Sequence, residues 1–303
     1  MGRDRVKEEK DFNEITTVNS GAEINKIKNI ILKIITNDIK LVAKNESQKK
    51  LIQSIKNNEV TICSGRAGTG KTFVALAYAL SLLRKSNNRY KRIYLVKSVT
   101  TLKNEELGFL KGDMKDKFEP FMWSYYINME KLIFESAITT LREQEIIRPF
   151  PLAYIKGSSM DDCIIIADEM QNVILDNALT LLTRIGTNCK LIVLGDVDQI
   201  DLKNKKDSSL EALLKMYADV DQIGTIEMNE NDTNVRNPLI DIIVEKYKEY
   251  MATIDVSGNT KTVKTISLAD LKEARKKTLN DWANPNHLSP IELNELEKNG
   301  NGE

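Results

Sequence analysis

Residues 65 to 72 combine three glycines with a lysine and a threonine at a spacing suited to binding phosphate. The segment is Gly65-Arg66-Ala67-Gly68-Thr69-Gly70-Lys71-Thr72. Glycines let backbone N–H groups approach a phosphate closely and adopt conformations closed to residues with a Cβ atom. We expect Lys71 to reach the β- and γ-phosphates of a nucleotide and the Thr72 hydroxyl to coordinate Mg²⁺. The alternative is a glycine loop that matches the pattern by chance. A predicted strand before the loop and a predicted helix after it make a chance match much less frequent.

Two adjacent carboxylates follow an apolar run further along the chain. Residues 164–167 read Ile-Ile-Ile-Ala and lead directly into Asp168 and Glu169. Ligands of open α/β sheets bind at the carboxyl ends of the strands, where this pair would lie. We expect Asp168 to hold Mg²⁺ and Glu169 to orient or deprotonate the attacking water. Taken alone, the pair is as well explained by a solvated acidic turn, but the phosphate loop favours the catalytic interpretation.

A third polar cluster, residues 195–201, follows another apolar run, residues 191–194. Its Gln199 can hydrogen-bond both a γ-phosphate and the lytic water, which makes it our candidate sensor of the γ-phosphate. The acids around Gln199 could instead cap a turn. Gln171, two residues after Glu169, could also sense the γ-phosphate or couple to a bound polymer.

Strands and helices that alternate along the chain must position these clusters. Apolar runs predict strands at residues 60–63, 93–96, 164–167, 191–194 and 223–228. Helical patterns predict helices at residues 47–56, 71–83, 176–185 and 238–247, the third ending at Gly186 as its C-terminal glycine. This order predicts an α/β domain with a mostly parallel sheet over about residues 41–250.

The two ends of the chain differ from this central domain. Residues 1–40 begin as a polar arm and continue from Ile24 with an isoleucine stripe typical of an amphipathic helix. Residues 251–303 are polar, and we expect them to be partly ordered. There the pairs Ser267/Asp270 and Ser289/Glu292 each resemble a capping box that opens a short helix.

The composition excludes several classes of protein. Lys plus Arg and Asp plus Glu both number 44, so net charge neither indicates nor excludes a nucleic-acid partner. The single histidine, His287, argues against histidine-based zinc or triad chemistry. The cysteines, Cys63, Cys163 and Cys189, adjoin apolar runs and are typical of buried thiols in a reducing compartment. No apolar run is long enough to span a membrane, so we expect a cytoplasmic protein.

Together these motifs closely resemble the PhoH family, whose ATPase core is related to superfamily 1 helicases. The resemblance covers roughly residues 46–247 and includes the distinctive segments 107–113, 151–157 and 182–186. Met170 replaces an alanine that is usual in the family. Asn237 replaces the histidine of a Val-Arg-His-Pro motif, which puts the role of that histidine in doubt here.

The resemblance implies a RecA-like P-loop NTPase core that binds ATP and Mg²⁺. It also suggests that Gln48 recognises adenine, an interpretation we weigh equally with an exposed helical glutamine. Lys97 begins a segment that looks like a strand-end motif with which helicases contact the nucleic-acid backbone. The resemblance therefore favours single-stranded RNA or DNA as a partner.

Superfamily 1 helicases bind ATP between two cores, whereas only one core fits in this sequence. The arginine that the second core would supply must come from elsewhere in the chain or from a neighbouring subunit. We therefore expect a head-to-tail ring, most simply a hexamer, with Arg236 as the first candidate and Arg184 as the second. Either arginine could equally make an ordinary surface salt bridge. Between residues 103 and 134, lysines precede several aromatic residues, a pattern that fits either nucleic-acid binding or an inserted helix packed on the core.

These observations predict an Mg²⁺-dependent ATPase that acts on RNA. The nearest alternative is an ATPase that acts on protein or serves phosphate-starvation signalling. A nucleotide-gated assembly scaffold is a further alternative. A small-molecule kinase would need an acceptor site and lid arginines that the sequence does not show.

Overall fold

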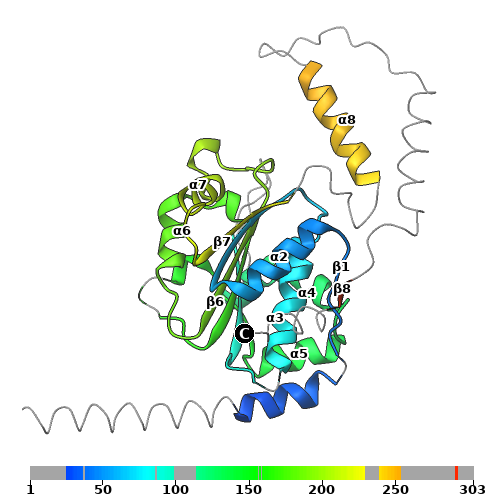
Figure 1. The fold of residues 1–303 in the computed structure, drawn as a ribbon, viewed down its shortest axis with the longest axis vertical. Helices are drawn as coiled ribbons and strands as arrows, with labels where there is room; N and C mark the ends of the chain where they lie inside the picture. The colour runs from blue at the N-terminus through cyan, green and yellow to red at the C-terminus, as the bar shows by residue number, and fades with distance from the viewer. Residues whose placement is uncertain are drawn as a thin grey trace, which may run out of the picture.

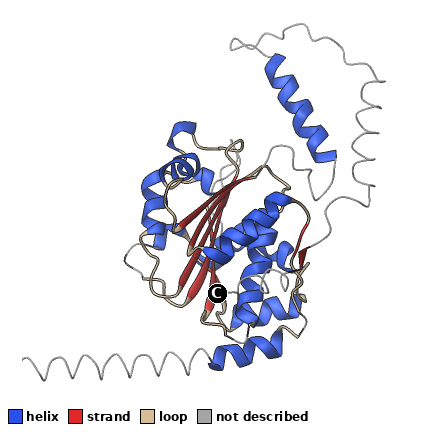
Figure 2. Cartoon of the chain, viewed as in Figure 1, coloured by secondary structure: helices blue, strands red, loops and turns tan. Residues whose placement is uncertain are grey.

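A six-stranded, fully parallel sheet forms the centre of the chain (Figures 1 and 2). The computed structural model describes residues 25–36, 38–85, 87–98, 114–155, 157, 159–228, 239–253 and 291–292. The strand order is β4-β3-β5-β6-β2-β7. The strands are β2 (Val60–Ser64), β3 (Arg92–Lys97), β4 (Ile147–Pro149), β5 (Cys163–Asp168), β6 (Cys189–Gly195) and β7 (Ile223–Glu227). The predicted α/β class and parallel sheet are therefore confirmed.

Helices cover both faces of this sheet (Figure 1). One face carries α2 (Glu46–Asn57), α3 (Lys71–Arg84), α4 (Met114–Met129) and α5 (Glu135–Glu143). The other carries α6 (Leu175–Leu182) and α7 (Ser209–Met216), whereas α8 (Leu239–Thr253) is drawn apart from the sheet. The 3₁₀ turns are η1 (Leu152–Tyr154), η2 (Met170–Asn172) and η3 (Lys205–Asp207). Each strand of the centre is thus buried on both sides, which explains the continuous apolar runs.

Successive residues of the central strands enter two different hydrophobic cores. On β5, Ile164 and Ile166 join the core beneath α2, α3, α4 and α5. Ile165 and Ala167 join the core beneath α6 and α7. All four side chains are fully buried, and burial of an isoleucine contributes about 1.5–3 kcal/mol. This alternation fixes the register of the strand, because a slip by one residue would exchange its two faces.

The register aligns the carboxyl ends of the strands at one edge of the sheet. Ser64 at the end of β2 pairs with Gly195 of β6. Lys97 at the end of β3 pairs with Asp168 of β5. The three polar clusters predicted to do chemistry therefore emerge from neighbouring strands at the same edge.

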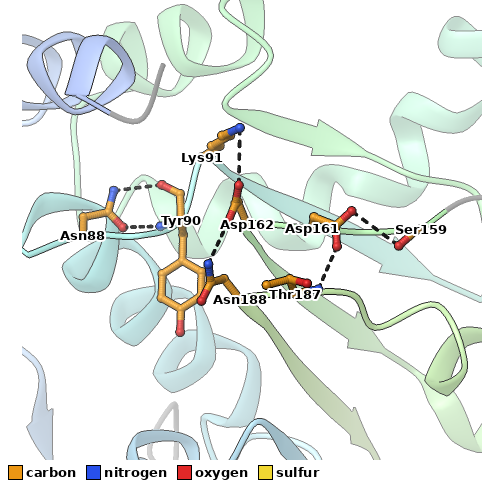
Figure 3. A network of polar contacts seen from close by, with 8 residues as sticks. All are labelled: Asn88, Tyr90, Lys91, Ser159, Asp161, Asp162, Thr187 and Asn188. Carbon is orange, nitrogen blue, oxygen red and sulfur yellow. Dashed lines mark hydrogen bonds and ion pairs between the residues drawn. The ribbon is translucent and has the colours of Figure 1, made fainter. Parts of the chain in front are cut away.

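The opposite edge of the sheet is held by a polar network (Figure 3). Asp162 pairs with the Lys91 ammonium at 3.3 Å and accepts a hydrogen bond from Asn188 Nδ2 at 3.0 Å. Asp161 accepts a hydrogen bond of 2.7 Å from the Thr187 N–H. These contacts join the segments that enter β3, β5 and β6, so they fix where three adjacent strands begin.

Gly186 has a different role from the one predicted. Helix α6 ends at Leu182, three residues earlier than the sequence pattern suggested, and Thr183 caps it with φ of −79°. Gly186 does not have positive φ, but a Cβ atom there would lie 2.0 Å from Asp161 Oδ1. The glycine is needed for close approach to this carboxylate, not to end the helix.

The segment before the sheet packs against the core as its isoleucine pattern predicted. A helix spans residues 25–34, and Ile31 and Ile35 are buried beside α3 and α4. Arg84, in the last turn of α3, donates a 3.0 Å hydrogen bond from Nε to the Ile35 carbonyl. Arg84 also pairs with Asp38. The predicted arm that precedes this helix lies outside the described residues.

The prediction of a helix opening at Ser289/Glu292 is wrong where the structure can test it. Ile291–Glu292 forms a short strand, β8, antiparallel to β1 (Val42–Ala43). Backbone pairing with β1 therefore overrides the local capping pattern. The other proposed box, Ser267/Asp270, lies outside the described residues.

The aromatic residues after the lysine cluster are mainly structural. Phe118, Tyr125 and Tyr126 of α4 are buried, whereas Trp123 is 60% exposed. The Tyr125 hydroxyl lies within hydrogen-bond distance of the carbonyls of Val96 (2.8 Å) and Ile166 (3.2 Å), and burial raises its pKa well above the ordinary value. The segment 99–113 and the side chains of residues 114–117 lie outside the described part.

None of the helices in the described part of the chain is long and apolar enough to cross a membrane. The three cysteines are free and buried, as expected. Burial raises the pKa of Cys63 to about 12. A hydrogen bond between Cys163 and Cys189, whose sulfurs lie 3.7 Å apart, raises the pKa of Cys163.

Candidate nucleotide-binding site

The phosphate loop connects β2 to α3 at the carboxyl edge of the sheet. Gly68 and Gly70 adopt φ of 85° and 88°, a left-handed conformation that a residue with a Cβ rarely takes. Thr69 turns back on Arg66 through a 2.8 Å hydrogen bond from its hydroxyl to the Arg66 carbonyl. The loop thus has the geometry that its glycine spacing predicted, and it opens a helix whose first N–H groups can bind phosphate.

Lys71 is buried at the start of α3, with 9% of its surface exposed. Its ammonium donates to the carbonyls of Gly65 and Arg66, the latter at 2.9 Å. The loop therefore satisfies the lysine with its own backbone. Phosphate oxygens would be stronger acceptors, because a bond between two charged groups is about twice as strong as a neutral one.

Thr72 and Asp168 form the predicted metal-binding pair. The Thr72 hydroxyl donates a 2.8 Å hydrogen bond to Asp168 Oδ2, and Asp168 is only 6% exposed. A hydroxyl and a carboxylate are the hard oxygen donors that Mg²⁺ prefers, and Mg²⁺ sites usually add phosphate oxygens and water. The residues therefore fit the ion, which when bound would neutralise charge on the β- and γ-phosphates.

Glu169 follows Asp168 in a constrained conformation. Its φ is 59° and its ψ is 33°, the left-handed region that costs a non-glycine residue of order 1–3 kcal/mol. Its carboxylate accepts a 2.7 Å hydrogen bond from Gln171 Nε2. Both constraints aim Glu169 at the pocket, where it can orient or deprotonate a water molecule.

A pocket of about 700 Å³ brings these residues together. Lys71, Thr72, Asp168, Glu169 and Gln199 all line it, so the sequence clusters meet as predicted. Gly65, Arg66 and Thr69 shape the phosphate loop, whereas Ala67, Gly68 and Gly70 also line the pocket. Sequence reasoning missed further lining residues, namely Val42, Lys44, Phe73, Asn128, Lys131 and Asp196. Of these, only Asp196 lies in a recognised motif, and α4 offers no pattern that would reveal Asn128 or Lys131.

Gln48 lies at another wall of the pocket and is not the exposed glutamine of the alternative interpretation. It is 3% exposed, donates from Nε2 to the Thr69 carbonyl at 2.8 Å, and accepts at Oε1 from the Lys44 N–H at 2.9 Å. A primary amide has two donor hydrogens and two lone pairs. Each polar atom of Gln48 therefore has capacity for one more bond, as contact with an adenine edge would require.

Gln171 connects three segments of the site through hydrogen bonds of its side chain. It is fully buried, accepts the Asp196 N–H at 3.1 Å and donates to the Gln199 carbonyl at 3.1 Å besides its bond to Glu169. A Cβ at Gly195 would lie 2.6 Å from Gln171 Oε1, so the glycine makes room for this amide. The interpretation of Gln171 as a direct sensor of phosphate thus gives way to a positioning role.

Of the two arginine candidates, the structure places only Arg184, and this residue does not line the pocket. Arg184 lies between α6 and β6, and its carbonyl accepts the Met160 N–H at 3.0 Å. That segment precedes β5 and β6, so Arg184 is at the edge of the sheet opposite the phosphate loop. Arg184 therefore cannot reach the pocket of its own chain in this structure. Arg236 and the neighbouring Asn237 lie outside the described residues.

Lys97 ends β3 beside Asp168, the candidate metal ligand. Its ammonium donates a 2.7 Å hydrogen bond to Ser124 Oγ of α4. Ser98 donates from its hydroxyl to the Asn172 carbonyl at 3.1 Å. The strand-end segment that resembles a helicase motif is therefore anchored both to α4 and to the turn that follows Glu169.

The part of the sequence that forms this site matches a known protein family and its members. The family model described as "PhoH-like protein" matches residues 40–248. A PhoH-like protein of Synechocystis sp. is 37% identical over 206 residues, which are 68% of this chain and 62% of the relative. A PhoH-like protein of Bacillus subtilis is 36% identical over 204 residues, 67% of this chain and 63% of the relative. The chain therefore matches less than two thirds of the length of these relatives.

Among solved structures, the large terminase of a thermophilic bacteriophage, determined in complex with ADP, matches 68% of this chain and 50% of its own. The TM-score is 0.34 and the identity 10%, which are too low to support a functional comparison. The match over residues 40–248 and the identities above 30% are sufficient by themselves to assign the family. This chain belongs to the PhoH-like protein family.

Proposed function

We propose that this protein hydrolyses ATP with Mg²⁺ and couples hydrolysis to single-stranded RNA in the cytoplasm. The observation that carries the ATPase proposal is the convergence of Lys71, the Thr72–Asp168 pair and Glu169 on one pocket at the carboxyl edge of the sheet. Lys71 would bind the phosphates, and Glu169 would take a proton from the attacking water. Gln199, exposed on the pocket wall, is positioned to contact that water or the γ-phosphate.

The position of Lys97 supports the choice of a polymer as partner. It pairs in register with Asp168, so a nucleic-acid backbone held there would lie next to the metal-binding pair. The bond to Ser124 links Lys97 to α4, whose Trp123 is exposed and available for stacking. The resemblance to helicase strand ends points to single-stranded RNA or DNA over a protein substrate.

The exposed face of α8 supports assembly into a ring. Leu239, Ile243 and Tyr247 recur every four residues and are each more than half exposed. Such spacing places them on one side of a helix. An uncovered apolar stripe of this kind marks an interaction surface. We propose that subunits associate head to tail, most simply as a hexamer, and that Arg236 or Arg184 of one subunit completes the ATP site of the next.

ATP turnover at low salt, with and without single-stranded RNA, tests the proposal. We expect RNA to stimulate turnover several-fold, and Glu169→Gln to abolish turnover while nucleotide binding remains. Glutamine can keep the contact with Gln171 through its carbonyl, so this variant is a matched control. Added salt should suppress stimulation, because each contact with a phosphate of a single strand lowers the logarithm of the binding constant by about 0.7 for each tenfold rise in salt.

The same assay separates the alternatives. Single-stranded DNA as competitor identifies the preferred polymer. Turnover that neither polymer changes would reject the nucleic-acid motor and leave an ATPase directed at protein. Assembly on ATP without polymer-dependent turnover would favour the scaffold.

A further inference from the structure

Asp196, the first residue after β6, places a carboxylate on the phosphate loop. Its Oδ2 accepts the N–H of Ala67 at 2.9 Å, and its Oδ1 accepts the N–H of Asp198 at 3.0 Å. The side chain lines the pocket and only 6% of the residue is exposed. An acidic group thus occupies one donor of a loop whose other donors would face the phosphates in the proposed function.

The same residue is tied to Glu169 through an unbroken chain of hydrogen bonds. The Asp196 N–H donates to Gln171 Oε1 at 3.1 Å, and Gln171 Nε2 donates to Glu169 at 2.7 Å. The Asp196 carbonyl accepts the N–H of Gln199 at 3.1 Å. Both bonds are made by main-chain atoms of Asp196, so a shift of its backbone would be transmitted both to Glu169 and to the candidate sensor, Gln199.

A terminal phosphate would compete with this carboxylate. The loop N–H groups attract negative charge, and two anions that share them repel each other strongly because a buried site screens charge poorly. A nucleoside triphosphate extends one charged group further along the loop than a diphosphate does. The repulsion should therefore weaken binding of the triphosphate more than that of the diphosphate.

We propose that Asp196 determines how the site discriminates between ATP and ADP, and that its contact with Ala67 positions the Gln171–Glu169 pair according to which nucleotide is bound. This inference rests on the proposed ATPase function. Asp196 is a positioning and specificity-determining residue, since it acts on Glu169 through Gln171. With ADP its carboxylate keeps the Ala67 N–H, and with ATP it is driven from that N–H.

Asp196→Asn removes the charge, and the asparagine carbonyl oxygen can still accept the Ala67 N–H. The N–H of Asp198 loses its acceptor in this variant, with either nucleotide bound. We expect the variant to bind a non-hydrolysable β,γ-imido analogue of ATP about tenfold more tightly than the wild type does. Its affinity for ADP should change less than about twofold. Both affinities are measured in Mg²⁺ buffer by competition with a fluorescent ADP.

Asp198→Asn is the matched control. It removes the same charge two residues further on, from an exposed side chain outside the residues that line the described pocket. The control should leave the ratio of the two affinities unchanged. If Asp196→Asn does not fold, Asp196→Ser keeps an acceptor without the charge and carries the same expectation.

The outcomes are distinct for this inference and for the ATPase proposal. An equal change in both affinities, or the same shift in Asp198→Asn, would overturn the role of Asp196. A triphosphate affinity that falls in Asp196→Asn would overturn it too. If the wild type binds neither nucleotide, the ATPase proposal fails as well.

Discussion

At the residue scale, the site is built from polar side chains that are buried and already paired. Gln171, Asp168 and Asp196 are at most 6% exposed, and each bonds to another part of the site. Buried polar groups with partners are rigid, whereas a single removal leaves the partner unsatisfied at a cost of about 1–3 kcal/mol. Precise positions in this pocket therefore depend on hydrogen bonds among its own side chains, including those of the fully buried Gln171.

Gln171→Leu should show this dependence directly. Leucine has a similar size but leaves the Asp196 N–H without an acceptor and Glu169 without its donor. We expect the free energy of unfolding to fall by about 1–3 kcal/mol. Turnover should fall by about tenfold or more, as expected when a catalytic base loses its orientation. Urea unfolding and an ATP turnover assay measure the two effects.

The exposed glutamine Gln222 provides the control for that experiment. Gln222→Leu should leave both stability and turnover near those of the wild type. Normal turnover in a folded Gln171→Leu protein would show that Glu169 does not need this contact.

The sequence identified the chemical groups better than their partners. Lys71, Thr72, Asp168 and Glu169 lie where their motifs predicted, because a strand end and a glycine turn determine these positions locally. The roles of Gln48 and Asp196 depend on backbone atoms more than 20 residues away. No local pattern encodes such contacts, so the sequence left Gln48 undecided and Asp196 unassigned.

At the element scale, the central strands, the edge strand β7 and the helix α8 were predictable, whereas β4 and α4 were not. The buried strands β2, β3, β5 and β6 form continuous apolar runs, whereas the edge strand β4 has three residues and includes Pro149. Helix α4 has an internal proline, Pro120, and a weak apolar pattern because it packs on several sides. Element assignment from pattern thus succeeds where burial is regular and fails where it is not.

Lys190 of β6 contacts the end of α2, and its contribution to the free energy of unfolding depends on pH. It is buried and donates from its ammonium to the carbonyls of Ile55 and Asn58 at the end of α2. Burial, and then the nearby charge of Arg89, lower its pKa from 10.5 to about 8. Between these values the unfolded chain binds more protons than the folded one, so this residue makes stability rise with pH.

The test is urea unfolding of the wild type and Lys190→Met at about pH 7.5 and about pH 10, on either side of the lowered pKa. We expect the stability of the wild type relative to the variant to increase by on the order of 2 kcal/mol between them. Lys215→Met is the control, because Glu211 raises the pKa of this exposed lysine. A relative stability that does not change with pH would contradict a lowered pKa for Lys190.

At the scale of the whole molecule, no arginine lines the candidate nucleotide-binding pocket in the described part of the chain. Arg184 lies at the far edge of the sheet, and the stripe on α8 is uncovered. Both features are consistent with the proposed assembly, in which one subunit completes the site of the next. Counting cores in the sequence suggested a partner subunit, which stays a prediction, because no pattern within one chain can specify how copies pack.

Mixing two inactive variants tests whether the arginine acts between subunits. Arg236→Ala should lower turnover by about 10³-fold, as loss of an arginine finger does. A mixture with Glu169→Gln should recover activity, because the Glu169→Gln subunits supply the arginine to intact Glu169 sites. The measurement is turnover of the mixture against each variant alone. No recovery with Arg236→Ala, but recovery with Arg184→Ala, would transfer the role to Arg184.

The in-register pairing of Lys97 with Asp168 also has a mechanical consequence. Adjacent strands lie about 4.8 Å apart. A polymer bound at Lys97 would therefore lie less than the length of one nucleotide from Asp168, the candidate metal ligand. Force produced by phosphate release would then act on the polymer without a lever arm. In the proposed function, the stiffness of this connection would be that of two neighbouring strands in one sheet.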